Sequence, residues 1–347
     1  MRRNFVYFSA LLSFCLPINE LKVIAQETSE KKPTIQLTQT LPKLDRSTEV
    51  AVGMYLIDFD DFNEQEESFT LDGYLFLNWR DERLAFNPSQ TGGKHKTYNS
   101  GQIWTPNVSF LNIEGKREAA YKELKVKPDG TVYYKEKFTG QFNYELDLKE
   151  FPFDNQKIQI ILTTLDDSKN IIFTVDKTKT GKSQDAFLAG WTIGEEQANV
   201  RTIKSDIEEA YFPEFVYEID VFRYSKPYIW NIILPLLFII GLSWTVFWSR
   251  SFESNTVIAT SSLLSAIAFN IVVAEELPKV AYLTFINGFI LIVYIFICLV
   301  VIYTVVKHRL DLEKQKERSL KIDRVARWLV PVMFAASNIG LLAFFLL

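Results

Sequence analysis

The stretch "SFESNTVIATSSLLSAIAFN", from Ser251 to Asn270, lies in the hydrophobic C-terminal part of the chain, yet it is rich in polar residues. It carries one glutamate, two asparagines, two threonines and five serines. Polar side chains inside a membrane are costly and typically mark the path of an ion or a substrate. The stretch therefore predicts a membrane helix that does more than anchor the protein.

Four apolar segments surround and include this stretch. Each holds roughly 20 residues, enough to cross a hydrocarbon core about 30 Å thick at the rise of an α-helix. They predict an all-α four-helix transmembrane domain over 227–347, with a cytoplasmic loop at 307–326. The predicted helices are 228–248, 254–273, 283–306 and about 327–347.

The loops between these segments predict the orientation of the chain. The connection "KHRLDLEKQKERSLKIDR" is strongly basic and the short link "SRS" carries Arg250, so both are expected in the cytoplasm. The connection "AEELPK" is then on the other side. We expect a multi-pass protein of the inner membrane, with its N-terminal domain and its C-terminus on the periplasmic or extracellular side.

The first residues, "MRRNFVYFSALLSFCLPINELKVIAQ", predict a secretory signal peptide over 1–25. Two arginines precede an apolar run, and the small Ala25 is suited to a cleavage site. A retained membrane anchor is the alternative, although about a dozen apolar residues are short for a span. Cleavage would remove Cys15 and leave Cys298 alone, so the mature chain would form no internal disulfide.

The region 34–226 contains short runs in which apolar and polar residues alternate. Val, Ile, Tyr and Phe are frequent in them, and Gly, Pro, Asn or Asp separate them. This pattern predicts an outer all-β, immunoglobulin-like sandwich of about ten strands. The runs are "EVAVGMYLIDF", "SFTLDGYLFLNW", "TVYYKEKFTG", "KIQIILTTL", "NIIFTVD" and "FVYEIDVFRY".

The composition disfavours several classes of function. A formal net charge of -4 is too close to neutrality to suggest a nucleic-acid partner. Two histidines, His95 and His308, are too few for a histidine-based metal site or a Ser-His-Asp triad, and no glycine-rich phosphate loop occurs. The acidic run "DFDDFNEQEES" is more typical of a solvated loop than of a catalytic pair, although it could concentrate cations at a pore mouth. We expect no enzyme, no cofactor and no metal site.

The segment "LDLKEFPFDNQKIQI", residues 146–160, resembles the signature loop of the pentameric ligand-gated ion channels, the Cys-loop receptor superfamily. In that loop Phe-Pro-Phe-Asp is followed two residues later by Gln. Tyr144 and Ile158 stand where eukaryotic members have bracketing cysteines, as in the cysteine-free bacterial branch. Further motifs, before and after this segment, occur in the order typical of the family, and the resemblance extends from about residue 34 to the C-terminus. These motifs are "NWRDERLAF", "IWTPN", "NIILPLLFI" and "AFNIVVAEELPK".

The resemblance implies a homopentameric, ligand-gated channel for monovalent cations, embedded in membrane lipid. An acid-activated bacterial member of the family is especially similar, so we expect opening by low extracellular pH. The same channel gated by an unknown small ligand is the alternative. A membrane-anchored periplasmic binding or sensor protein is a second alternative. A membrane-tethered hydrolase is disfavoured, because the sequence lacks a plausible catalytic group.

Helical geometry and the resemblance together select one face of the polar stretch as the pore lining. The resemblance decides between this face and neighbouring ones that the helical angle also allows. Five copies of Glu253 would form a ring that selects cations, or Glu253 would only complement the helix N-terminus, worth about 0.3 to 1 kcal/mol. The remaining residues would form the ion path and an apolar gate that closes by dewetting, or would pack against lipid or other helices. The predicted pore residues after Glu253 are Val257, Ser261, Leu264, Ala268 and Ile271.

Two of the positions in this helix depart from the related channels. Val257 stands where cation channels of this branch often have threonine, which makes the inner constriction less polar. Ala266 stands where the acid-activated relative has histidine, which weakens the expectation of proton gating.

The resemblance also suggests which residues sense protons and transmit the signal. Glu67 and Asp58 match acidic positions of the acid-activated relative, and burial or neighbouring carboxylates can shift such groups into the activating pH range. Glu64, Asp154 and Arg223 match a charged cluster at the junction of the two domains. We predict that Asp154 pairs with Arg223 and couples the signature loop to the first membrane helix; the alternative is a purely structural salt bridge.

The transmitter pocket of the animal receptors is an aromatic cage that holds an amine by cation–π attraction. The corresponding positions here retain Tyr74 and Phe212, whereas Leu111 and Leu165 replace two other aromatic residues. A quaternary amine is therefore not expected as the agonist. Tyr74 and Phe212 remain candidates for a ligand site, or are core or interface aromatics.

Overall fold

The structure is a computed structural model that describes residues 39–42, 47–91, 93–206, 209–276 and 279–346. The predicted signal peptide at 1–25 and the first residues of the predicted outer domain lie outside the described residues. The described chain confirms the predicted architecture, a β-sandwich followed by four long apolar helices.

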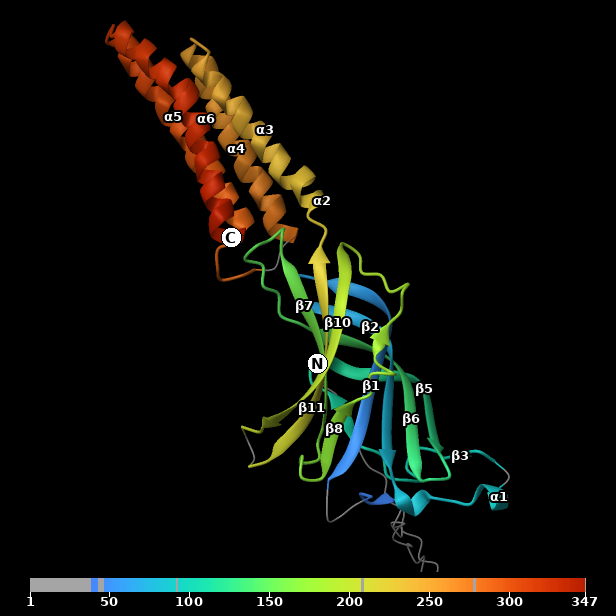
Figure 1. The fold of residues 1–347 in the computed structure, drawn as a ribbon. Coiled ribbons are helices and arrows are strands. Elements are labelled where there is room, and N and C mark those ends of the chain that lie inside the picture. The colour runs from blue at the N-terminus through green and yellow to red at the C-terminus, as the bar shows by residue number, and fades with distance from the viewer. Residues whose placement is uncertain (1–38, 43–46, 92, 207–208, 277–278, 347) are drawn as a thin grey trace, which may run out of the picture. The chain divides into compact units, whose positions relative to one another are not determined.

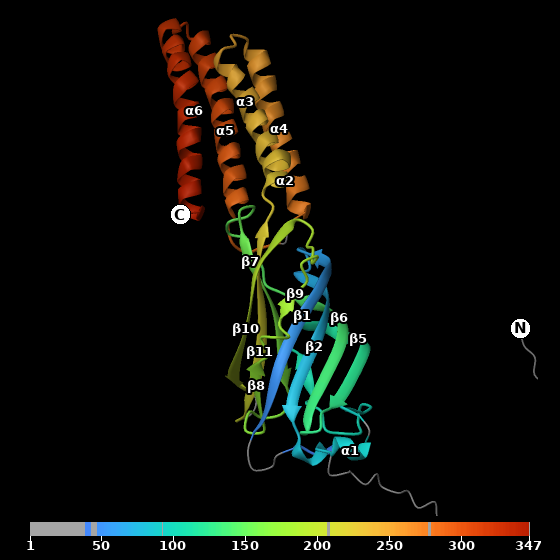
Figure 2. The same ribbon diagram turned by 45° about the vertical axis from the view of Figure 1, so that its right-hand side comes forward.

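The sandwich consists of two sheets within the described residues. One is seven-stranded, in the order β3-β5-β6-β2-β1-β8 with β9 also paired to β1, and the other has the order β10-β11-β7-β4. Figure 2 shows β1, β2, β6 and β5 side by side in the larger sheet. The strands are β1 (Thr48–Asn63), β2 (Ser68–Arg80), β3 (Lys96–Thr97), β4 (Val108–Phe110), β5 (Ile113–Val126), β6 (Thr131–Asn143), β7 (Asn155–Thr164), β8 (Ile171–Val175), β9 (Gly181–Lys182), β10 (Trp191–Lys204) and β11 (Tyr211–Arg223), with a 3-10 turn at Glu82–Leu84 and a short helix α1 (Pro88–Thr91).

The alternating pattern of the sequence decides which face of each strand is buried. Along β2 the odd-numbered residues from Phe69 to Trp79 are buried, whereas Tyr74, Phe76 and Asn78 point to the opposite face and are half-buried. Successive side chains of a strand alternate between faces, so one register places the apolar set in the core. The same rule leaves a row of aromatic and polar side chains on the outer face of this sheet.

The membrane domain consists of four helical segments, which run side by side in Figure 1. All four are long and apolar enough to cross a membrane. The first segment is irregular, because Pro235 has no N–H to donate to the preceding turn and a wider π turn comes directly before it. The elements are α2 (Lys226–Tyr228), the π turn Ile229–Ile233, α3 (Leu234–Trp244), the 3-10 turn Thr245–Phe247, α4 (Phe252–Glu276), α5 (Phe285–Leu312) and α6 (Lys316–Leu346).

The structure differs from the sequence-based expectation at the predicted cytoplasmic loop, 307–326. Helix α5 continues to Leu312 and α6 already begins at Lys316, so only 313–315 interrupt the helices. Hydropathy placed the predicted boundary where charged residues begin, but Lys, Arg and Glu are good helix formers. A buried ion pair, with 2.9 Å between Lys307 Nζ and Asp323 Oδ2, joins the end of α5 to the start of α6.

Candidate pore and gating junction

Helix α4 has one face that is exposed in the isolated chain. The side chains of Val257, Leu264 and Ile271 are 62%, 69% and 57% exposed, although all three are apolar. Glu253, Ser261 and Ala268 are exposed as well. All six predicted pore residues therefore lie on a surface of α4 that the other helices of the same chain leave uncovered.

The opposite face of α4 packs against α3 and α5. It is lined by small and polar side chains that allow close approach, namely Asn255, Ala259, Ser262, Ala266 and Val273. Tyr294 of α5 donates a hydrogen bond from its hydroxyl to the carbonyl of Ala266, at 3.3 Å. Ala266 is thus an interhelical residue, and the position where the acid-activated relative has histidine faces α5 rather than the exposed surface.

Glu253 occupies the first turn of α4, where a carboxylate complements the positive end of the helix dipole. The hydroxyl of Ser251 donates a hydrogen bond to Glu253 Oε2 at 3.0 Å. The neighbouring Phe252 stacks on the imidazole of His308 in α5, with ring centroids 3.7 Å apart. These contacts hold the start of α4 in place and leave the Glu253 carboxylate exposed.

Arg223, at the end of β11, joins three separate segments of the chain. Its Nε and Nη2 donate to the two carboxylate oxygens of Asp154 at 2.7 and 3.1 Å. Its Nη1 donates to both oxygens of Glu64, in the turn between β1 and β2, at 2.7 and 2.8 Å. The side chains of Arg223 and Asp154 are only 1% and 2% exposed. The structure therefore brings the three residues of the predicted coupling cluster together.

Aromatic rings surround the same guanidinium. Its central carbon lies 4.1 Å from the ring centroid of Trp191 and 4.7 Å from that of Phe151, and Nη1 donates to the hydroxyl of Tyr228 at 3.1 Å. Burial opposes the charge of Arg223, but the hydrogen bonds to Asp154 and the negative charges of Asp154 and Glu64 outweigh it and raise its pKa. Arg223 therefore stays cationic.

The signature loop also contacts the membrane helices directly. The backbone N–H of Leu148 donates to the hydroxyl of Tyr282 at 3.0 Å, and that hydroxyl donates to the carbonyl of Leu146 at 3.3 Å. The N–H of Phe285, the first residue of α5, donates to the carbonyl of Lys149 at 2.8 Å. A movement of this loop would therefore pull on the start of α5.

The two proton-sensing candidates lie on the β1 strand and the turn that follows it. Asp58 accepts hydrogen bonds from the backbone N–H groups of Phe59 and Phe187, at 2.9 and 3.0 Å. Glu67 is half-buried, and its Oε1 lies 3.5 Å from the N–H of Leu146, where the signature loop begins. Protonation would weaken each carboxylate as an acceptor, so both residues stay candidates for sensing acid.

The two agonist-site candidates are not brought together within one chain. Tyr74 lies on β2 of the larger sheet and Phe212 lies on β11 of the smaller one. The ring of Tyr74 is covered by the ammonium group of Lys135, 4.2 Å from the ring centroid. A pocket that uses both aromatic residues would need a second chain.

Several junction residues were not predicted from the sequence. Gln156 donates from Nε2 to Asp154 Oδ2 at 2.6 Å and to the carbonyl of Asp147 at 2.8 Å, which orients the carboxylate. It could have been found, because it is the Gln of the signature motif. No sequence motif marks Tyr282, because its contact with Leu146 joins residues that are 136 positions apart.

Comparison with known proteins agrees with this arrangement. The family model of the neurotransmitter-gated ion-channel ligand binding domain matches residues 38–223. The chain belongs to this family of ligand-gated ion channels, and it is a multi-pass membrane protein with its N-terminal domain outside.

Two relatives indicate its place within the family. A proton-gated ion channel of Gloeobacter violaceus is 40% identical over 304 residues, which are 87% of this chain and 84% of the relative. The human gamma-aminobutyric acid receptor subunit alpha-2 is 26% identical over 274 residues, 73% of this chain and 58% of that subunit.

Proposed function

We propose that five copies of the chain surround a central pore, which conducts monovalent cations and opens when the outer solution becomes acidic. The observation that carries the proposal is the exposed face of α4, where Glu253, Ser261 and Leu264 lie without cover from their own subunit. In a ring of five subunits, this face would line a water-filled pore along the central axis. The identity with a proton-gated channel supports the acid trigger.

The order of residues along α4 supports a division of the pore into zones. Five copies of Glu253 at the cytoplasmic end would attract cations and repel anions, and the hydroxyls of Ser261 would contact a passing ion. Leu264, Ala268 and Ile271 would form an apolar constriction that closes when water leaves it. Val257 adds an apolar ring next to the charged one, which we expect to lower the conductance.

The junction around Arg223 supports a route from the outer domain to the pore. Glu64 belongs to the β1–β2 turn and Asp154 to the signature loop, and Arg223 lies three residues before the first membrane segment. We propose that protons act on carboxylates of the outer domain, Asp58 and Glu67 among them, and that this junction passes the change to the helices.

Stepping the outer pH from 7.5 to 4.5 is expected to evoke a cation current. The measurement uses the full-length channel in oocytes or in planar bilayers, with surface protein quantified by labelling. Protein present at the surface without current at any pH would contradict proton gating. It would favour a small ligand as the agonist, an alternative that Ala266 also favours because the histidine of the acid-activated relative is missing there.

The purified protein is expected to be a pentamer of about 190 kDa, from five chains of somewhat under 40.2 kDa each. Size-exclusion chromatography with light scattering, corrected for bound detergent, measures this mass. A monomer or dimer would contradict the channel and favour a membrane-anchored binding or sensor protein.

A further inference from the structure

The α3–α4 link, residues 248–251, connects the first membrane segment to the helix proposed to line the pore. Only these residues separate the end of the 3-10 turn at Phe247 from the start of α4 at Phe252. Glu253 is the second residue after the link. A shift of so short a connection would move the Glu253 carboxylate with it, so the contacts that hold the link also place that carboxylate.

Two cations from other helices bind main-chain carbonyls at this link. Nζ of Lys307, in α5, donates to the carbonyl of Ser249 at 3.1 Å, and Nε of Arg327, in α6, donates to the carbonyl of Phe247 at 3.0 Å. Carbonyls at the end of a helix have no partner within that helix, and positive charge there complements the helix dipole. The end of the first membrane segment is therefore capped by side chains of α5 and α6.

Asp323 of α6 holds the ammonium group of Lys307 in place. Its Oδ2 accepts from Lys307 Nζ at 2.9 Å and its Oδ1 accepts from the hydroxyl of Tyr303 at 2.6 Å, so both carboxylate oxygens are bonded. The side chains of Lys307 and Asp323 are only 8% and 11% exposed. The ammonium group is thus fixed between α6 and the Ser249 carbonyl.

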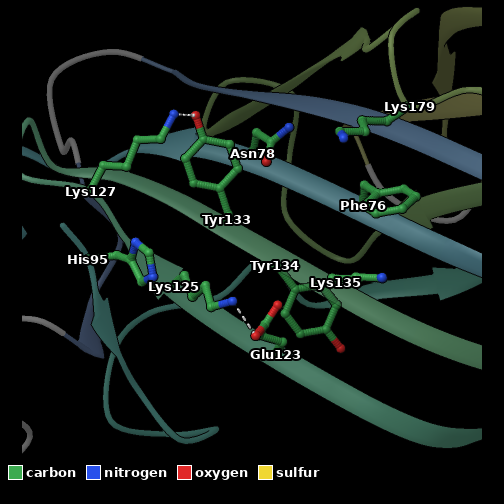
Figure 3. Close-up of a pocket in the computed structure, with 10 residues that line it drawn as sticks. All are labelled: Phe76, Asn78, His95, Glu123, Lys125, Lys127, Tyr133, Tyr134, Lys135 and Lys179. Atoms are coloured by element: carbon green, nitrogen blue, oxygen red, sulfur yellow. Dashed lines mark hydrogen bonds and ion pairs between the residues drawn. The ribbon is translucent and has the colours of Figure 1, made fainter. Parts of the chain in front are cut away.

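The burial of this pair needs a reason beyond joining two helices. An apolar pair of similar size joins helices about as well as a buried ion pair does, because ions lose their hydration on burial. Figure 3 shows a pair that avoids this loss, between Lys125 and Glu123 on the larger sheet, where both side chains stay partly exposed. An apolar side chain at position 307 could not donate to the Ser249 carbonyl. The bond to the α3–α4 link therefore accounts for the buried charge of Lys307.

Further contacts lead from the anchored carbonyl to Glu253. The hydroxyl oxygen of Ser249 accepts from the N–H of Ser251 at 3.4 Å, and the hydroxyl of Ser251 donates to Glu253 Oε2 at 3.0 Å. Before the link, the ring of Phe247 packs edge to face against that of Tyr303, with centroids 4.8 Å apart. Lys307 is thus connected to the Glu253 carboxylate through two residues of the link.

We propose that Lys307 and Asp323 are positioning residues for ion selection. By fixing the Ser249 carbonyl they hold the start of α4, and with it the Glu253 carboxylate, at a set distance from the pore axis. The inference rests on the proposed function, because it takes Glu253 to face a cation-conducting pore. Lys307 and Asp323 act only through the position of Glu253.

The test replaces the pair by apolar residues, Lys307→Met together with Asp323→Leu, so that neither charge is left buried without its partner. Amide hydrogen exchange of the purified full-length channel at pH 7.5 reports the order of the link, because the N–H groups of Ser254 and Asn255 donate to Ser251 at 3.3 and 3.0 Å. Exchange in this first turn of α4 is expected to become roughly tenfold faster, as fits the loss of one hydrogen bond from a charged group.

The same variant is expected to move the reversal potential under a gradient of NaCl away from the sodium equilibrium potential, as removing the charge of Glu253 would. It removes one positive and one negative charge, so the net charge is unchanged and the shift reports the position of Glu253. Arg309→Gln together with Glu313→Gln is the matched control. It removes an exposed pair at the same end of α5 and should change neither quantity.

Unchanged exchange in the apolar variant would overturn the proposal, and so would faster exchange with an unchanged reversal potential. The midpoint of thermal unfolding is measured first, so that a general loss of stability is not mistaken for release of the link. Exchange needs no current. A channel that is silent at every pH would contradict the proposed function, while exchange would still decide whether the pair anchors the link.

Discussion

Replacing Arg223 with glutamine is expected to abolish the acid-evoked current and to destabilise the protein by about 3–5 kcal/mol, the range for breaking a buried ion pair. The substitution leaves the buried Asp154 without its bidentate partner, and it separates the signature loop from the β1–β2 turn that carries Glu64. The midpoint of thermal unfolding and the current at pH 4.5 measure the two effects.

Two further variants separate a coupling role of Arg223 from a structural one. Arg80→Gln is the matched control, since Arg80 forms an exposed pair with Glu82 at 3.9 Å and should change neither quantity. Asp154→Asn keeps the shape of the side chain and removes its charge. If it lowers the unfolding midpoint but activates at the same pH as the unchanged channel, the pair is structural and the coupling role is wrong.

Replacing Glu253 with lysine is expected to turn the channel from cation-selective to anion-selective. In the proposed pentamer, five carboxylates at the mouth of the pore would become five ammonium groups, so the local potential would change sign at the point where ions enter. Reversal potentials measured under a tenfold gradient of NaCl should move from near the sodium equilibrium potential towards that of chloride. Glu253→Gln should give an intermediate value.

The matched control for this ring is Glu317. It is also exposed, lies in the first turn of α6 and is expected on the cytoplasmic side, but it does not belong to α4. Glu317→Lys should leave the reversal potential unchanged. If both substitutions shift the reversal potential equally, Glu253 acts only through the general charge of the cytoplasmic surface. If neither substitution shifts it, Glu253 only complements the N-terminus of α4.

The strands that could be predicted are those with one clearly apolar face. Strand β2 is an example, because its alternate residues from Phe69 to Trp79 enter the core. Strands β5 and β10 are not among the runs recognised in the sequence, since most of their side chains are exposed and hydrogen bonds to β6 and β11 hold them in the sheets. Their pairing depends on neighbours that lie far away in the sequence.

The candidate site was predictable where a motif or a charge pattern marks it. The polar residues of α4 and the charges of Asp154 and Arg223 are visible in the sequence. Only the family resemblance indicates which face of α4 lines the pore and which charged residues belong to the coupling cluster. The contact of Tyr282 with Leu146 was not foreseen, because the two residues are 136 positions apart and no periodicity connects them. Sequence patterns report what lies along one element, and this contact joins two separate loops.

The link between the signature loop and α5 has a consequence for genetic studies of this channel. The bond from the Phe285 N–H to the Lys149 carbonyl joins two main-chain groups, so side-chain substitutions at either residue leave both atoms in place. An alanine scan would therefore rate this connection as unimportant. An amide-to-ester replacement at residue 285 would remove the donor while keeping the side chain, and it would reveal mechanical continuity that conventional mutagenesis does not detect.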